Sequence, residues 1–115
     1  MNESYEKEKL LAEKYINKYN LISPDKDPMR ISIPQGWYDL VCELTDNLID
    51  AGWERTLYQI KEKFGGLRFY IATDIEELQK IILAAEDASY SICPVCGELK
   101  SKVECHELCS KKNYW

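Results

Sequence analysis

The stretch that decides the fold reads RTLYQIKEKFGGLRFYIA and spans residues 55–72. Two runs rich in β-branched and aromatic residues, 56–64 and 67–72, flank the pair Gly65-Gly66. The two-residue turns that join antiparallel strands need positive φ angles, which glycine adopts without strain. The stretch therefore predicts a β-hairpin with the two glycines as its loop.

One face of this predicted hairpin is apolar except for a single carboxylate. With the glycines as the loop, Phe64 faces Leu67, and alternation places every second residue on the same side. We expect the carboxylate to pair with a cation or with a backbone N–H; the alternative is an acid of raised pKa in a site. The residues of this face are Tyr58, Ile60, Glu62, Phe64, Leu67, Phe69 and Ile71.

The opposite face is predicted to be cationic, with Lys63 directly across from Arg68. Like charges in a cross-strand pair destabilise a hairpin by some tenths of a kcal/mol. A repulsion that is tolerated indicates an anionic partner such as a phosphate, a nucleotide or an acidic protein surface. The alternative is a solvated face neutralised by nearby Glu side chains. The residues of this face are Gln59, Lys61, Lys63, Arg68 and Tyr70.

Amphipathic helices are predicted on both sides of the hairpin. Apolar residues recur at helical intervals over residues 3–20 and again over residues 36–51, where Gly52 is a natural end. After the hairpin, Thr73 is placed to cap a third helix that runs to about residue 91, with acidic residues in its first turn. The helices and the hairpin together predict an α+β fold.

Four cysteines at the C-terminal end indicate a metal site. Thiolates hold Zn²⁺ tetrahedrally, and a Cys-x-x-Cys pair lets one turn present two sulfurs to the ion. Pro94 and Gly97 suit such a turn, because it needs a fixed φ and then a residue without Cβ. We expect a structural Zn²⁺, with redox activity of the first pair as the alternative. The predicted ligands are Cys93, Cys96, Cys105 and Cys109, and His106 competes with Cys105 for one place.

Composition limits the environment and the partners. The chain has 115 residues and a net charge of −5, which weakens bulk electrostatic binding to DNA but allows a local cationic patch. The N-terminal residues 1–9 are charged, and no apolar run approaches the roughly 20 residues of a membrane span. Clustered cysteines favour metal in a reducing compartment over extracellular disulfides. We therefore expect a cytoplasmic protein without a membrane partner.

The run KEKFGGLRFY, residues 61–70, resembles a family of small bacteriophage and prophage proteins. The resemblance covers about residues 34–109, since a helix with Gly36-Trp37 precedes the run and Cys-x-x-Cys-Gly follows it. It implies a phage or mobile-element origin and a zinc-knuckle end, but no reaction and no catalytic residues. The chain departs from the family pattern at its second half-site, where Cys105-x-x-x-Cys109 replaces Cys-x-x-Cys or Cys-x-x-His.

These features predict one domain over residues 1–115, made of an N-terminal helix (1–22), a helix–hairpin–helix core (34–92) and a zinc-binding module (93–109). A closed four-ligand site leaves no open position for metal catalysis, so we do not expect an enzyme. The favoured function is a zinc-stabilised accessory protein that binds a host protein. The alternative is a nucleotide or nucleic-acid binder. The predicted contact residues are Lys61, Lys63, Arg68 and Tyr70.

Overall fold

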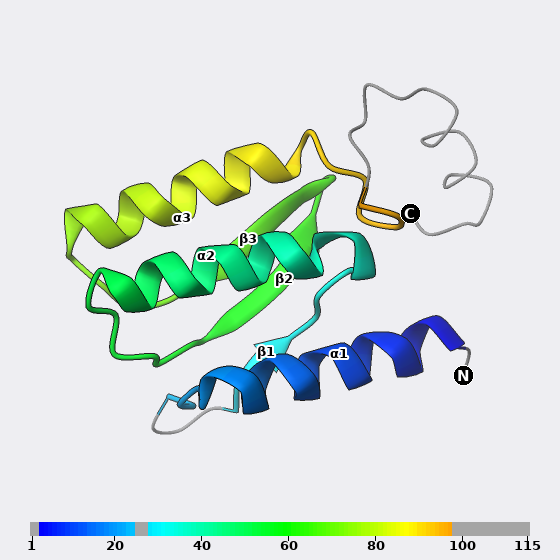
Figure 1. The fold of residues 1–115 in the computed structure, drawn as a ribbon, viewed down its shortest axis with the longest axis horizontal. Helices are drawn as coiled ribbons and strands as arrows, with labels where there is room; N and C mark the ends of the chain where they lie inside the picture. Colours follow the sequence, from blue (N-terminus) through cyan, green and yellow to red (C-terminus); the bar gives the residue numbers. More distant parts are fainter. Residues whose placement is uncertain (1–2, 25–27, 98–115) are drawn as a thin grey trace.

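The computed structural model describes residues 3–24 and 28–97, and within them it confirms an α+β fold (Figure 1). Three α-helices and one short 3-10 helix accompany a three-stranded sheet in this part of the chain. The elements in chain order are α1 (Glu3–Tyr19), β1 (Arg30–Ile31), η1 (Gln35–Trp37), α2 (Tyr38–Asp50), β2 (Gln59–Lys63), β3 (Gly66–Tyr70) and α3 (Glu76–Ser89).

The sheet contains one strand more than the predicted hairpin. The strand order is β1-β2-β3, with β1 parallel to β2 and β2 antiparallel to β3. The N–H of Arg30 donates to the carbonyl of Tyr58 at 3.1 Å, and the N–H of Ser32 donates to the carbonyl of Ile60 at 2.9 Å. A two-residue strand has no periodicity of its own, and its partner lies far along the chain, so the local sequence gave no signal for it.

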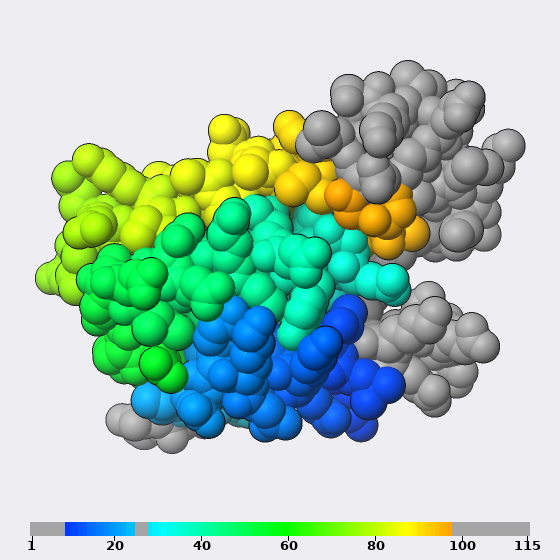
Figure 2. Space-filling view, viewed as in Figure 1, coloured from blue at the N-terminus to red at the C-terminus, as the bar shows by residue number. Residues whose placement is uncertain are grey.

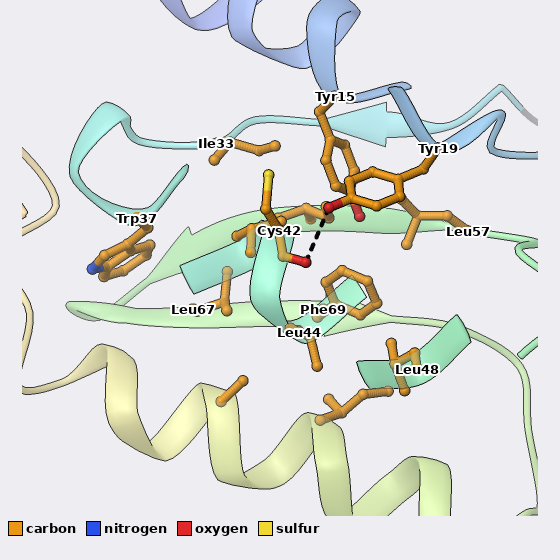
Figure 3. Close-up of a cluster of buried hydrophobic side chains, with 14 of the residues drawn as sticks. Tyr15, Tyr19, Ile33, Trp37, Cys42, Leu44, Leu48, Leu57, Leu67 and Phe69 are labelled. Atoms are coloured by element: carbon orange, nitrogen blue, oxygen red, sulfur yellow. Dashed lines mark hydrogen bonds between the residues drawn. The ribbon is translucent and has the colours of Figure 1, made fainter. Parts of the chain in front are cut away.

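The three α-helices lie on one face of this sheet, with α2 in the middle (Figure 1). From that side the helices form much of the visible surface, and the segment at residues 93–97 lies beside them (Figure 2). The core forms between α2 and the strands, and Tyr15 and Tyr19 join it from α1 (Figure 3). The hydroxyl of Tyr19 donates to the carbonyl of Cys42 at 3.2 Å. The N-terminal helix is therefore packed onto α2.

The end of α2 is set by Gly52, as the sequence predicted. Gly52 has φ +102°, its N–H donates to Ile49 at 3.0 Å, and the N–H of Trp53 donates to Leu48 at 2.9 Å. These two bonds form a Schellman motif, which satisfies the last carbonyls of the helix. The following chain turns away here and enters the sheet.

The hairpin loop differs by one position from the prediction. The loop residues are Phe64 and Gly65, with φ +54° and +83°, and Lys63 pairs with Gly66. Two positive φ angles in succession are those of a type I′ turn. The expected pairs Phe64–Leu67 and Lys63–Arg68 are therefore wrong. The pairing moves by two residues, which keeps each residue of the two strands on the face predicted for it.

Gly66 is needed for space rather than for its φ angle. A Cβ built on Gly66 would lie 2.3 Å from the ring of Tyr90, which packs over the strand from the end of α3. The two glycines of the run thus have different roles, because Gly65 supplies the left-handed turn and Gly66 admits a neighbouring ring.

The third helix begins later than predicted. Its first helical residue is Glu76, and Ile75 is the N-cap, so Thr73 is not the capping residue. The Thr73 hydroxyl instead accepts a hydrogen bond from the N–H of Ile75 at 3.0 Å, and its carbonyl accepts one from Gln79. Thr73 therefore closes the turn that precedes the helix.

Candidate functional site: the outer sheet face and the cysteine turn

The four predicted contact residues share one surface, the face of the sheet that points away from the helices. Strand alternation separates this face from the core, where Ile60 and Leu67 are fully buried. Of the outward residues, Lys63 and Tyr70 are exposed, and Lys61 and Arg68 are half-buried. We call this surface the outer face; its residues are Arg30, Tyr58, Gln59, Lys61, Lys63, Arg68 and Tyr70.

Two cations still face each other on this surface, but they are Lys61 and Arg68. Their charged groups turn apart. The Lys61 ammonium lies 5.9 Å from the centre of the Tyr70 ring, and the Arg68 guanidinium donates to the hydroxyl of Tyr90 at 3.1 Å. That hydrogen bond raises the pKa of Arg68 above its usual value. Both cations are therefore held by aromatic side chains.

Tyr58 joins the outer face because the strand begins with an irregularity. The N–H of Tyr58 donates to the carbonyl of Tyr70 at 3.0 Å, although Tyr70 is already the cross-strand partner of Gln59. Two residues opposite one is the arrangement of a β-bulge, which turns a side chain to the other face. The prediction that Tyr58 belongs to the apolar face is therefore wrong.

A hollow lies beside the bulge at one end of the outer face. Its walls carry two tyrosines, one cation and two prolines, and Tyr58 and Tyr70 are 42% and 40% exposed. Aromatic rings at this level of exposure present a flat apolar surface to a partner. The hollow is lined by Pro24, Pro28, Arg30, Tyr58, Gln59 and Tyr70.

Glu62 has a structural partner and does not line a site. Its carboxylate accepts a hydrogen bond from the N–H of Gly65 at 2.6 Å, and the side chain is exposed at the hairpin end. The bond closes the turn. The predicted pairing with a backbone N–H is thereby confirmed, and the carboxylate has no buried setting that would suit an acid catalyst.

The free edge of β3 is closed by side chains of α3. The N–H of Leu67 donates to the hydroxyl of Ser89 at 2.8 Å, and the N–H of Phe69 donates to the carboxylate of Glu86 at 2.9 Å. An open strand edge offers unpaired N–H groups to other chains. Here they are satisfied within the molecule, so β3 presents its outer face and not its edge.

Sequence reasoning missed two members of the outer face, Arg30 and Tyr58, and the residue that holds Arg68, Tyr90. Arg30 lies on a strand without a periodic signal, Tyr58 depends on the bulge, and Tyr90 follows a helix that was read only for its apolar stripe. The glycine pair was an available signal for Tyr90, because a strand glycine outside the loop often marks the close approach of another group.

The described half of the predicted metal site is a tight turn docked on η1. The N–H of Gly97 donates to the carbonyl of Cys93 at 2.8 Å, and Gly97 has φ +82°. The N–H of Gly36 donates to the carbonyl of Pro94 at 2.7 Å. This position of Gly97 requires glycine, as the spacing predicted.

Trp37 fastens the same turn to the core. Its ring is fully buried, and its Nε1–H donates to the carbonyl of Ile92 at 2.9 Å (Figure 3 shows the ring). A Cβ on Gly36 would lie 2.2 Å from the carbonyl oxygen of Cys93, so only glycine allows this contact. Gly36 and Trp37 thus hold the turn at residues 93–97, which we call the cysteine turn, against the core.

The other predicted ligands, Cys105, Cys109 and His106, lie outside the described residues. Cys93 is fully buried, and Cys96 is exposed and disulfide-bonded. Within residues 3–24 and 28–97, no group of three or more His, Cys, Asp or Glu side chains is placed to hold a metal ion. Thiolates are what a zinc site needs, and Cys96 offers one only when its disulfide is reduced.

No helix in the described part of the chain has the length and apolar character needed to cross a bilayer. Comparisons of the chain with protein-family models, with curated proteins and with solved structures found no match. The outer face and the cysteine turn are therefore the candidate functional features of the described residues.

Proposed function

We propose that this chain is a small phage-type accessory protein that acts by binding a host protein in the bacterial cytoplasm. The outer face is the contact surface, and it meets an acidic patch on the partner. The proposal places the chain among binding proteins and not among enzymes.

The observation that carries the proposal is the charge of the outer face. Its strand residues include four cations and no acid, although the whole chain has a net charge of −5. Complementary potentials steer encounter and fix orientation at interfaces. Tyrosine and arginine are also enriched among the residues that dominate binding energy. The four cations are Arg30, Lys61, Lys63 and Arg68.

A structural Zn²⁺ held by the cysteine turn is part of the same proposal. The turn lies three residues after α3, whose last residue Ser89 holds β3 and whose C-cap Tyr90 holds Arg68. A metal that fixes the turn would therefore support the outer face through the end of this helix. In the proposed ligand set Cys93 and Cys96 supply two thiolates, and Cys105 and Cys109 supply the others.

Nucleotide or single-stranded nucleic-acid binding is the second candidate, favoured by the hollow beside Arg30. Exposed tyrosines on a sheet face stack on nucleobases, and neighbouring cations meet phosphates. Such binding weakens steeply with salt. A labelled single-stranded oligonucleotide titrated over a salt series tests it, and no binding at low salt would remove this candidate.

Capture from a host lysate on the immobilised full chain tests the main proposal. The variant Lys61→Glu/Lys63→Glu reverses two charges of the outer face. The control Lys9→Glu/Lys80→Glu makes the same change in net charge on α1 and α3, where both lysines are exposed. We expect one set of proteins to be retained by wild type and control and lost by the outer-face variant. Equal retention by both variants would refute the proposal.

A further inference from the structure

Phe64 combines an exposed aromatic side chain with an unfavourable backbone conformation. Its side chain is 86% exposed at the end of the hairpin, and its backbone has φ +54°. A left-handed conformation is unfavourable for a bulky residue, and type I′ turns prefer Asn or Gly at this position. The fold gains nothing visible from the ring, because no described core residue packs against it. A strained and exposed aromatic residue points to a role in binding.

The surroundings of Phe64 indicate the chemistry of its partner. The ammonium of Lys63 lies 5.7 Å from the centre of the ring, and Lys61 projects from the same strand face. An apolar anchor beside cations fits apolar side chains bordered by carboxylates. Glu62, whose carboxylate caps the turn at Gly65, puts a negative charge at the same end. That charge repels carboxylates and phosphates alike, so Lys61 and Lys63 are the places at this end where an anionic partner can be met.

We propose that Phe64 is the anchor of the outer face and that its occupant is an acidic protein segment carrying apolar side chains. Phe64 enters the apolar cluster of that segment, and Lys61 and Lys63 meet its carboxylates. The inference rests on the proposed binding function and names the partner by its chemistry.

The experiment uses a displayed library of random peptides selected on the full chain. We expect enriched peptides that combine Asp or Glu with aromatic or aliphatic residues. Synthetic copies should bind Phe64→Tyr like wild type and bind Phe64→Asn at least roughly tenfold more weakly, as expected for loss of an anchor. Leu10→Asn, which alters another exposed apolar residue on α1, is the matched control and should bind like wild type.

Thermal unfolding gives an independent readout. Because Asn suits the left-handed turn, Phe64→Asn should unfold at a temperature equal to or higher than wild type while it loses the peptide. Lower stability together with weaker binding would mean that Phe64 is structural, which would overturn the inference.

The remaining outcomes separate this inference from the proposed function. Peptide binding that survives Phe64→Asn but is lost in Lys61→Glu/Lys63→Glu would overturn the anchor and leave the acidic partner. Peptide binding that is unchanged in both variants would overturn the anchor role of Phe64 and the proposed outer-face binding function. Selection without acidic peptides would overturn the inference. So would Phe64-dependent binding to a single-stranded oligonucleotide or to phosphatidylglycerol vesicles.

Discussion

At the scale of single residues, Gly36 and Gly66 allow neighbouring groups to pack closely against the backbone. Gly36 lies under the cysteine turn, where a Cβ would meet backbone at 2.2 Å, whereas at Gly66 a Cβ would meet the side chain of Tyr90 at 2.3 Å. A backbone obstacle has no rotamer into which to move. The contact at Gly36 is therefore the stricter requirement.

We expect Gly36→Ala to destabilise the protein by about 1–3 kcal/mol, as overpacking does, because the cysteine turn must lift from η1. Gly66→Ala should cost less, since the Tyr90 ring swings aside. Urea unfolding of both variants measures the difference. An equal or reversed order would show that the turn is not seated on Gly36.

Tyr15 predicts how the protein responds to alkali. Its hydroxyl lies 2.6 Å from the Thr45 hydroxyl, which donates onward to the carbonyl of Val41, so Tyr15 is the donor of the pair. Burial raises the pKa of Tyr15 above the ordinary value of 10.0. The folded state therefore keeps its proton longer than the unfolded state. This stability is complete below about pH 10 and falls as the pH rises toward the folded pKa.

The alkaline loss should be smaller in Tyr15→Phe than in wild type, although the variant is less stable at neutral pH by about 1 kcal/mol for the lost hydrogen bond. Chemical unfolding at neutral pH and at several values above pH 10 measures both effects. Identical slopes against pH in the two proteins would assign the alkaline transition to other tyrosines.

At the scale of elements, the contact between α3 and β3 decides how the outer face is presented. Ser89 is fully buried, accepts from the N–H of Leu67 and donates to the carbonyl of Glu86. One hydroxyl thus closes both a strand edge and a helix turn. The edge of β3 is therefore fixed to α3, and the Arg68 guanidinium is directed toward the Tyr90 hydroxyl.

We expect Ser89→Ala to destabilise the fold by about 1–3 kcal/mol, because the buried N–H of Leu67 loses its acceptor. Ser91→Ala is the control, since Ser91 is exposed and lies just past the same helix. Denaturant unfolding of the two variants tests the contact. A loss at Ser91 as large as that at Ser89 would contradict it.

The outer face shows which parts of the site the sequence could predict. Alternation assigned Lys61, Lys63, Arg68 and Tyr70 correctly, because a shift of two residues in pairing leaves every strand residue on its face. The exact pairs were wrong, because Phe64 and not Gly66 takes a loop position, while Gly66 pairs with Lys63 beside the Tyr90 ring. Tyr90 lies 24 positions further along the chain, so Gly66 can signal the approach of another group but does not identify that group.

At the scale of the whole molecule, the cysteine turn links the core to the C-terminal end. Trp37 and Gly36 hold it on one side, and the end of α3 leads into it on the other. The left-handed conformation of Gly97 was predictable from the Cys-x-x-Cys-Gly motif. The contact of the turn with η1 was not predictable, because residues 36 and 94 meet only in the folded chain.

We expect the reduced full chain to bind one Zn²⁺ and to lose several degrees of thermal stability when a chelator removes it, because zinc in small modules contributes folding energy. Metal analysis, thiol titration and thermal unfolding with and without chelator measure this. Cys96→Ser should abolish binding, and Cys42→Ser, which alters a buried cysteine of α2, is the control. Fully oxidised cysteines without bound metal would show that a disulfide takes the place of the zinc site. An unchanged melting curve after chelation would show that metal does not stabilise the fold.

The central claim is that the outer face is the functional surface of the molecule. The most direct test is a nuclear magnetic resonance titration of the ¹⁵N-labelled full chain with an acidic peptide taken from the selection. We predict that the shifted amides fall in β1, β2, β3 and the loop at Phe64, and that Lys61→Glu/Lys63→Glu removes the shifts. Shifts concentrated on α1 or on the exposed side of α2, with β2 and β3 unchanged, would contradict the claim.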